Sequence, residues 1–230
     1  MKCALSYGAN AYTLHVNQNI PMEEAQKIED SFKELHTGVY TWGDRVYERS
    51  IKTGFITSTD GWRLKLPEYE KFKILKEKIE TITSEQWQRY RQGKFEYKAL
   101  KADRNYKIKI QQNYDFYKER KKGISDFFKL KSEYQRLCLN NPIQSCGSHM
   151  TKRAVLILFE WILKNNLLWR VKICNVPHDE IVAECEESLK EITRDAVEKS
   201  MIEGGNHYLS ILTIKADAAY ADNWESAKHN

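Results

Sequence analysis

Two short β-forming runs that meet at a polar corner, residues 171–184, form the most restrictive stretch of this chain. Val171 and Ile173 alternate with polar residues before the corner, and a second apolar run follows it. The pattern predicts a β-hairpin whose tight end carries two adjacent carboxylates, Asp179 and Glu180. Rigid oxygen ligands near a surface suit a hard cation such as Mg²⁺. An ordinary turn has the same composition, so this stretch alone leaves a metal site and a plain turn both open.

Four other motifs lie along the chain, and with His178, Asp179 and Glu180 they resemble the ordered motifs of family A DNA polymerases, the DNA polymerase I type. The likeness covers nearly everything except roughly residues 68–132. Five blocks in the right order are much more specific than any one of them. The other four blocks are Tyr7-Gly8-Ala-Asn-Ala with Asn19-Ile-Pro, Gly54-Phe with Gly61-Trp-Arg63, Arg136-x-x-x-Asn140-x-Pro-x-Gln144 with Lys152-Arg-Ala, and Asn223-Trp-Glu-Ser-Ala.

The resemblance implies an α+β fold, with a polymerase palm-type antiparallel sheet backed by long helices. Residues 1–67 are expected to hold the end of the fingers and the start of the carboxy-terminal palm region. Residues 68–133 are expected to form a charged, mainly helical insertion, and residues 134–230 the palm with the His-Asp-Glu hairpin.

The resemblance also implies chemistry at the hairpin. Family A polymerases join an incoming nucleotide to a DNA primer with the help of two Mg²⁺ ions. Asp179 fills the place of one metal-binding aspartate, Glu180 that of a weaker metal neighbour, and His178 and Glu180 are expected beside the primer end. The second aspartate belongs to an Asp-Tyr-Ser-type motif that these 230 residues lack. We therefore expect an amino-terminal polymerase portion to supply it, and the isolated chain to be inactive or nearly so.

Arg136, Asn140 and Gln144 are spaced four apart, so a helix would carry them on one face. Their counterparts in the family face primer-template DNA, where a guanidinium suits phosphate or sugar oxygens and amides suit minor-groove acceptors. Without the other motifs, the same stripe would be typical of the solvated side of a helix.

Three further positions have expected DNA or nucleotide contacts. Lys152 and Arg63 are expected to neutralise phosphates, although a solvated surface explains either residue nearly as well. Tyr7, with Gly8, is expected near the templating base, as the resemblance implies. The implied partners are thus primer-template DNA and deoxynucleoside triphosphates.

Residues 68–133 contain more lysine and arginine than acidic residues, with tyrosines interleaved. Such a segment suits nucleic acid, because cations pair with the backbone and aromatic rings stack on bases. The alternative is a solvated helical insertion whose aromatic residues form a small core of its own, and we favour that second interpretation.

Apolar residues at helical spacing predict five helices, and Asp60 with Gly61 predict the turn of a β-hairpin. The apolar positions of these helices include Ile28 and Leu35, Val39 and Ile51, Phe72 and Ile82, Tyr114 and Leu130, and Leu189, Ile192 and Ala196. Tyr106 to Ile110 alternates, which suits either a strand or a helix edge. A long helix is predicted from residue 134 to about 166, with a kink or a restart at Pro142. Leu209, Ile211 and Ile214 predict a final strand.

Within the long helix, the letters Gly-Ser-His-Met at residues 147–150 match a common remnant of tag removal. Their spacing from the neighbouring motifs favours native sequence.

The composition and net charge of the chain exclude few classes of function. The net charge of +5 permits a polyanionic partner without requiring one. Five scattered cysteines without metal-binding spacings indicate reduced thiols in a cytoplasmic compartment, the host cytoplasm for a phage protein. The apolar runs are too short to cross a membrane. Two alternatives remain: a non-catalytic DNA-binding protein derived from a polymerase palm, and a gene fragment without a function of its own.

Overall fold

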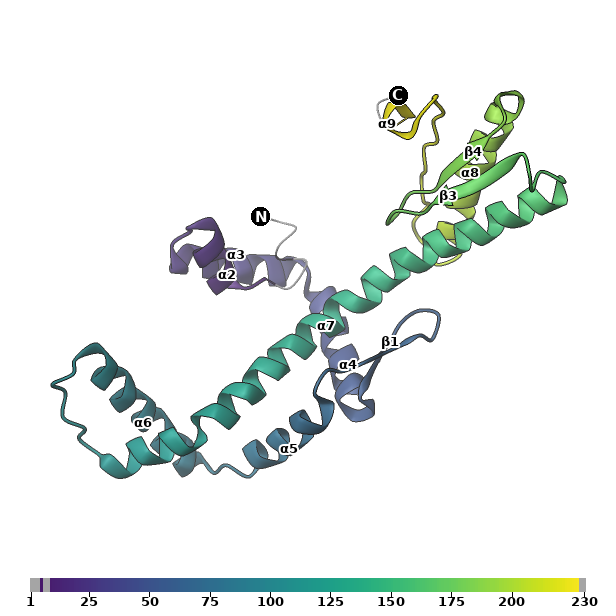
Figure 1. The fold of residues 1–230 in the computed structure, drawn as a ribbon. Helices are drawn as coiled ribbons and strands as arrows, with labels where there is room; N and C mark the ends of the chain where they lie inside the picture. Colours follow the sequence, from purple (N-terminus) through teal and green to yellow (C-terminus); the bar gives the residue numbers. More distant parts are fainter. Residues whose placement is uncertain (1–4, 6–8, 228–230) are drawn as a thin grey trace. The chain divides into compact units, whose positions relative to one another are not determined.

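The computed structural model describes residue 5 and residues 9–227, and the fold is mostly helical (68%) with two small antiparallel sheets. Helices and antiparallel strands agree with the α+β prediction. Within the described residues the strands form two separate two-stranded sheets, not one larger sheet. In chain order (Figure 1) the elements are α2 (Ala11–Gln18), α3 (Met22–Leu35), α4 (Thr37–Thr53), β1 (Phe55–Thr57), β2 (Arg63–Lys65), α5 (Tyr69–Glu80), α6 (Ser84–Ala102), α7 (Gln111–Lys164), β3 (Val171–Asn175), β4 (Val182–Cys185), the 3₁₀ turn η1 (Glu187–Leu189), α8 (Lys190–Asn206) and α9 (Trp224–Ala227).

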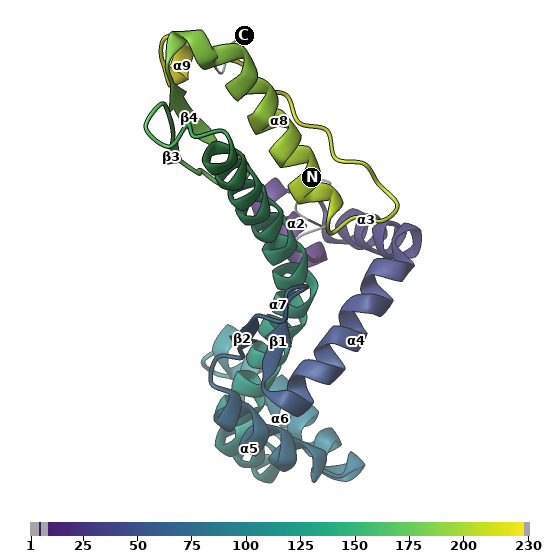
Figure 2. The same cartoon turned by 90° about the vertical axis from the view of Figure 1, so that its right-hand side faces the viewer.

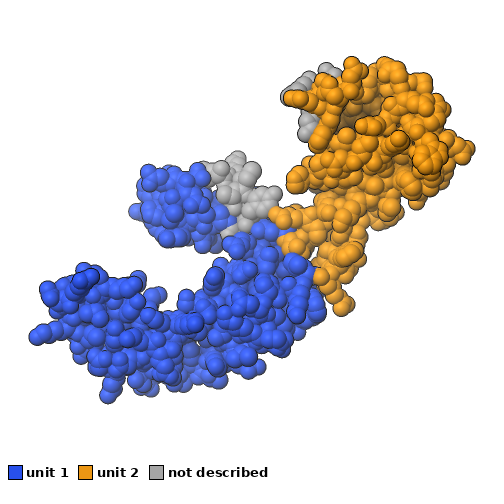
Figure 3. All heavy atoms as spheres, in the orientation of Figure 1, with its two compact units in different colours: residues 1–56, 64–140 blue, residues 57–63, 141–230 orange. Residues whose placement is uncertain are grey.

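The chain divides into two compact units (Figure 3). Unit 1 comprises residues 1–56 and 64–140, and unit 2 comprises residues 57–63 and 141–230. Each unit has at least one hydrophobic cluster of its own. Among the described helices, none combines the length and the apolar character that a membrane span requires.

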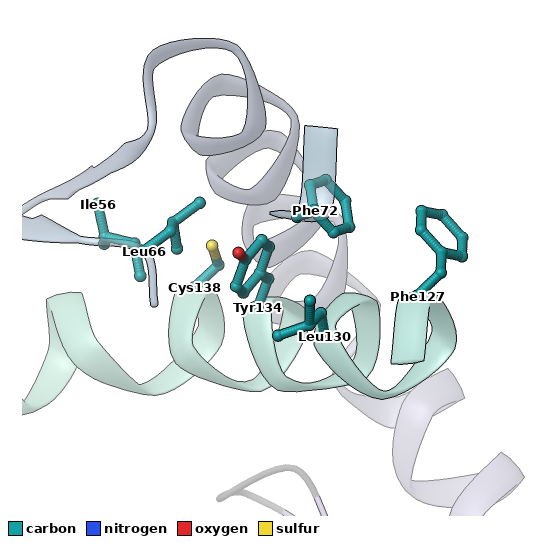
Figure 4. Packing of buried hydrophobic residues seen from close by; sticks show 7 residues of the cluster. All are labelled: Ile56, Leu66, Phe72, Phe127, Leu130, Tyr134 and Cys138. Carbon is teal, nitrogen blue, oxygen red and sulfur yellow. The ribbon is translucent and has the colours of Figure 1, made fainter. Parts of the chain in front are cut away.

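The main cluster of unit 1 forms where the first hairpin and α5 pack against α7 (Figure 4). Tyr134 and Cys138, one helical turn apart on α7, are fully buried against Ile56, Leu66 and Phe72. Burial raises the pKa of Tyr134 to about 12. Its hydroxyl donates a hydrogen bond of 2.5 Å to the carbonyl of residue 67, so the cluster also fixes the chain after β2.

The predicted amino-terminal helices are confirmed as α3 and α4. Gly54 ends α4 with φ at 81°, in the left-handed region that glycine enters without a Cβ penalty. One detail of the prediction is wrong: Leu35, expected on the buried face of α3, is 78% exposed at the end of that helix.

The segment predicted as an insertion folds as α5, α6 and the start of α7. Thr83 and Gln86 form a reciprocal capping box that begins α6. Its aromatic residues do form a small core, with Tyr90, Phe116 and Tyr117 buried. Residues 106–110 form neither a strand nor a helix; they belong to the loop between α6 and α7.

Helix α7 continues through Pro142, so of the two predicted alternatives, a kink or a restart, the restart is wrong. Proline leaves the carbonyl of Cys138 without its usual helical donor, at a typical cost of about 3 kcal/mol in a helix interior. Buried residues on both sides of the proline offset this cost, because each side of α7 packs into a hydrophobic cluster. The helix also begins at Gln111, so it joins the helix predicted around Tyr114 to Leu130 with the one predicted from residue 134.

In unit 2, α8 packs along the carboxy-terminal part of α7 and the hairpin β3–β4, as Figures 1 and 2 show together. At Gly204 the two helices meet closely, since a Cβ there would lie 2.7 Å from the backbone nitrogen of Ala154. Leu189 and Ala196 face inward as predicted, whereas Ile192 is 50% exposed.

The predicted final strand is absent from the described residues. Ile211 is 94% exposed, and residues 209–227 form no strand with any described residue. Ile214 instead folds back against the end of α8: it packs on Gly205, and its backbone N–H donates to Asn206 Oδ1 at 3.0 Å.

Candidate active site

The hairpin β3–β4 positions the predicted catalytic residues. Its strands pair in antiparallel register, with Val171 opposite Cys185 and Ile173 opposite Ala183, and a bulge follows Ile173. Val171 is almost completely buried in the cluster that α7 and α8 line. Burial of alternate residues fixes which face of the strand points outward.

An exposed ion pair closes the base of this hairpin. Arg170 Nη2 lies 2.6 Å from Glu186 Oε2, and the Glu186 backbone N–H donates to the Arg170 carbonyl at 3.1 Å. The hydrogen bond from the guanidinium lowers the pKa of the Glu186 carboxyl and raises that of Arg170. A surface pair of this kind adds little stability, but it aligns the two strands at the end of the hairpin opposite the turn.

The turn itself carries the three motif residues. Pro177 lies after the last ladder residue of β3, where its missing N–H costs no strand pairing. Its carbonyl accepts from the Glu180 backbone N–H at 3.0 Å. His178 adopts a left-handed conformation with φ at 52°, which histidine tolerates better than most residues. The turn therefore projects His178 and Asp179 into solvent.

The two carboxylates differ in their surroundings. Asp179 is exposed, and within the described part of the chain its side chain has no hydrogen bond or ion pair. Glu180 is half-buried, and its Oε1 accepts a 2.6 Å hydrogen bond from Trp224 Nε1 in α9. An available aspartate oxygen beside a fixed glutamate suits a hard divalent cation in donor type. In the described residues, no three histidine, cysteine or acidic side chains come together to hold a metal.

The residues expected to face DNA lie on α7. Arg136 and Gln144 are exposed, and Asn140 between them is half-buried. Helix geometry explains why: Tyr134 and Cys138 point into the core, and Arg136, two residues on from Tyr134, points roughly to the opposite side. Arg136 and Asn140 belong to unit 1 and Gln144 to unit 2.

The remaining expected residues are dispersed. Lys152 is exposed on α7, and Arg63 is exposed at the start of β2. Tyr7 and Gly8 lie outside the described residues. The structure thus brings His178, Asp179 and Glu180 together on one turn, and leaves the predicted DNA contacts as separate surface positions.

Sequence reasoning missed a polar cluster in unit 2. His149 is 6% exposed, and its Nδ1 lies 3.3 Å from Asp60 Oδ2 and 3.4 Å from Thr59 Oγ1. The hydroxyl of Tyr208 donates to the same Asp60 oxygen at 2.8 Å. Burial, then the bond to Asp60, raises the pKa of Tyr208. His149 is an interior residue of α7, and no residue spacing predicts its contact with Thr59, 90 positions earlier.

Trp224 was also missed as a site residue. It appeared only as part of the closing Asn-Trp-x-x-Ala motif, and nothing in its spacing predicts a bond to a glutamate 44 positions earlier.

Comparison with known proteins places these observations in a family. The chain is similar to DNA polymerase I of Aquifex aeolicus (strain VF5), with 33% identity over 86 residues, which are 37% of this chain and 15% of that protein. Its fold resembles the POL domain of Pol1 from M. smegmatis, solved in complex with DNA primer-template and dNTP. That match has a TM-score of 0.57 and 20% identity, and covers 89% of this chain and 26% of the other.

This chain spans only a minor part of the length of either relative. The model of DNA polymerase family A, by contrast, matches residues 1–226, nearly the whole chain. The chain belongs to DNA polymerase family A.

Proposed function

We propose that this chain takes part in template-directed DNA synthesis as the carboxy-terminal part of a family A polymerase. The observation that carries the proposal is the turn at the tip of β3–β4, where Asp179 and Glu180 are presented together by an anchored hairpin. The family match supplies the class of reaction.

In this proposal Asp179 is a metal ligand and Glu180 a weaker neighbour. Bound Mg²⁺ would supply activation of the primer 3′ hydroxyl and neutralisation of the departing pyrophosphate. The bond from Trp224 holds one Glu180 oxygen, which keeps the turn in one conformation, while Asp179 remains available for coordination. His178 contacts the primer end. The second aspartate comes from an amino-terminal polymerase portion that bears the Asp-Tyr-Ser-type motif.

The proposal assigns DNA binding to surface side chains. Arg136, Asn140 and Gln144 contact the primer-template through sugar oxygens and minor-groove acceptors. Lys152 and Arg63 neutralise backbone phosphates, and Tyr7 lies near the templating base. These contacts check the shape of a base pair without reading its sequence, which suits an enzyme that copies any template.

Primer extension tests the proposal. The chain is mixed with an amino-terminal polymerase portion, Mg²⁺, deoxynucleoside triphosphates and primer-template, and Asp179→Asn is compared with Glu184→Gln. Glu184 is an exposed carboxylate on β4 of the same hairpin, so this variant makes a matched control. We expect extension only in the mixture, lowered about a hundredfold or more by Asp179→Asn and little changed by the control.

Two results would contradict the proposal. Full extension by Asp179→Asn would remove this residue from the metal centre. DNA binding without extension in every mixture would favour the alternative, a non-catalytic DNA-binding protein derived from a polymerase palm.

A further inference from the structure

A groove between α6 and the start of α7, within unit 1, carries chemistry that the polymerase motifs do not use. It encloses about 800 Å³. Its floor is the aromatic core of the insertion, where Tyr90 and Tyr117 are buried with ring centroids 5.1 Å apart. Trp87 and Phe128 line the same groove.

The groove is positively charged. Arg91 and Lys94 line it from α6, and Lys121 lines it from α7; none of the described residues that line it is acidic. No carboxylate in the described part of the chain forms a salt bridge with these three residues. Lys121 lies over the ring of Tyr97 at 4.4 Å from its centroid, and Lys101 and Lys121 lower the pKa of Tyr97. A groove of this kind concentrates anions.

Two aromatic rings beside these cations remain available to a ligand. Phe128 is 49% exposed, although it contacts the core at Phe127. Trp87 is half-buried, and its ring lies 6.5 Å from that of Phe128, inclined at 55°. Phe128 lines the same groove as three cations, a combination that matches a ligand with both flat apolar faces and negative charge.

We propose that this groove binds single-stranded nucleic acid, with a base stacked on Phe128 and Trp87 and neighbouring phosphates on Arg91, Lys94 and Lys121. Unpaired bases offer open faces, whereas bases in a duplex are already stacked on their neighbours. Cations on both walls suit a backbone that passes along the groove. This site lies outside every motif that the polymerase resemblance covers, and its binding requires no synthesis.

Fluorescence anisotropy of the full chain with a labelled oligothymidylate tests the proposal in Mg²⁺-free buffer. The groove variant carries Arg91→Gln and Lys94→Gln together. The control variant carries Lys98→Gln and Lys122→Gln together, which removes the same charge from exposed positions that do not line the groove. We expect the groove variant to lower affinity about tenfold and to reduce the slope of log affinity against log salt by roughly 1.4. The control should change each quantity by much less.

Phe128→Ala tests stacking separately, with Phe95→Ala as its control because Phe95 is 65% exposed on α6 and does not line the groove. We expect Phe128→Ala to weaken oligothymidylate binding about tenfold and blunt duplex binding hardly at all. Photocrosslinking with a 5-iodouracil oligonucleotide should label the peptide that contains Phe128 or Trp87.

Equal affinity of the groove variants and their controls would overturn the proposal, as would crosslinks confined to other segments. A groove variant that loses binding of an acidic peptide but not of the oligonucleotide would assign the groove to a protein partner instead. Circular dichroism of each variant distinguishes lost binding from lost folding, and none of these readouts depends on polymerase activity.

Discussion

Trp224 connects the carboxy-terminal segment to the hairpin turn, and its indole N–H is the group that does so. Trp224→Phe keeps most of the ring and removes the donor to Glu180. We expect the free energy of unfolding to fall by about 1 kcal/mol, because the lost bond is to a charged acceptor that is only half-buried. Urea denaturation measures this change. Trp169→Phe is the matched control, since Trp169 is 84% exposed; an equal loss in both variants would mean that the bond contributes nothing specific.

Gly93 allows α6 to approach α7 closely. A Cβ at this position would lie 2.0 Å from the carbonyl oxygen of Asn113, a backbone atom that cannot move aside. We expect Gly93→Ala to destabilise the chain by about 1–3 kcal/mol, despite the better helix propensity of alanine.

The control for that substitution is Gly147→Ala on α7, where a Cβ would meet nothing within 4 Å. Here we expect a gain of about 0.5–1 kcal/mol from helix propensity alone. Thermal unfolding of both variants measures these stability changes, which we expect to have opposite signs. Stabilisation by Gly93→Ala would show that α6 and α7 are not held this closely in solution.

Across the whole molecule, the sequence predicted local structure better than long-range contact. Gly54 and the alternation around Val171 act through neighbouring residues, so a helix end and a hairpin were predictable. The continuity of α7 through Pro142 was not, because it depends on burial contributed by residues far away in the chain. The prediction of a final strand was wrong for a similar reason: the residues around Ile211 are strand formers, but among the described residues no strand pairs with them.

The candidate site divides in the same way. One turn carries His178, Asp179 and Glu180, so the local pattern was sufficient to predict that they lie together, while their catalytic role stays a prediction that rests on the family resemblance. The contact of Glu180 with Trp224 and the contact of His149 with Asp60 join distant segments, and no residue spacing reports such pairs.

The passage of α7 through Pro142 has a consequence for how this single helix opens to solvent. Residues such as Tyr134 on one side and Leu158 on the other belong to different hydrophobic clusters, and Pro142 removes one of the backbone bonds that link them. Amide hydrogen exchange should therefore show two protection levels along α7, with a step near the proline. A single uniform level would mean that both clusters melt as one. One helix would thus be shared by two independently opening units.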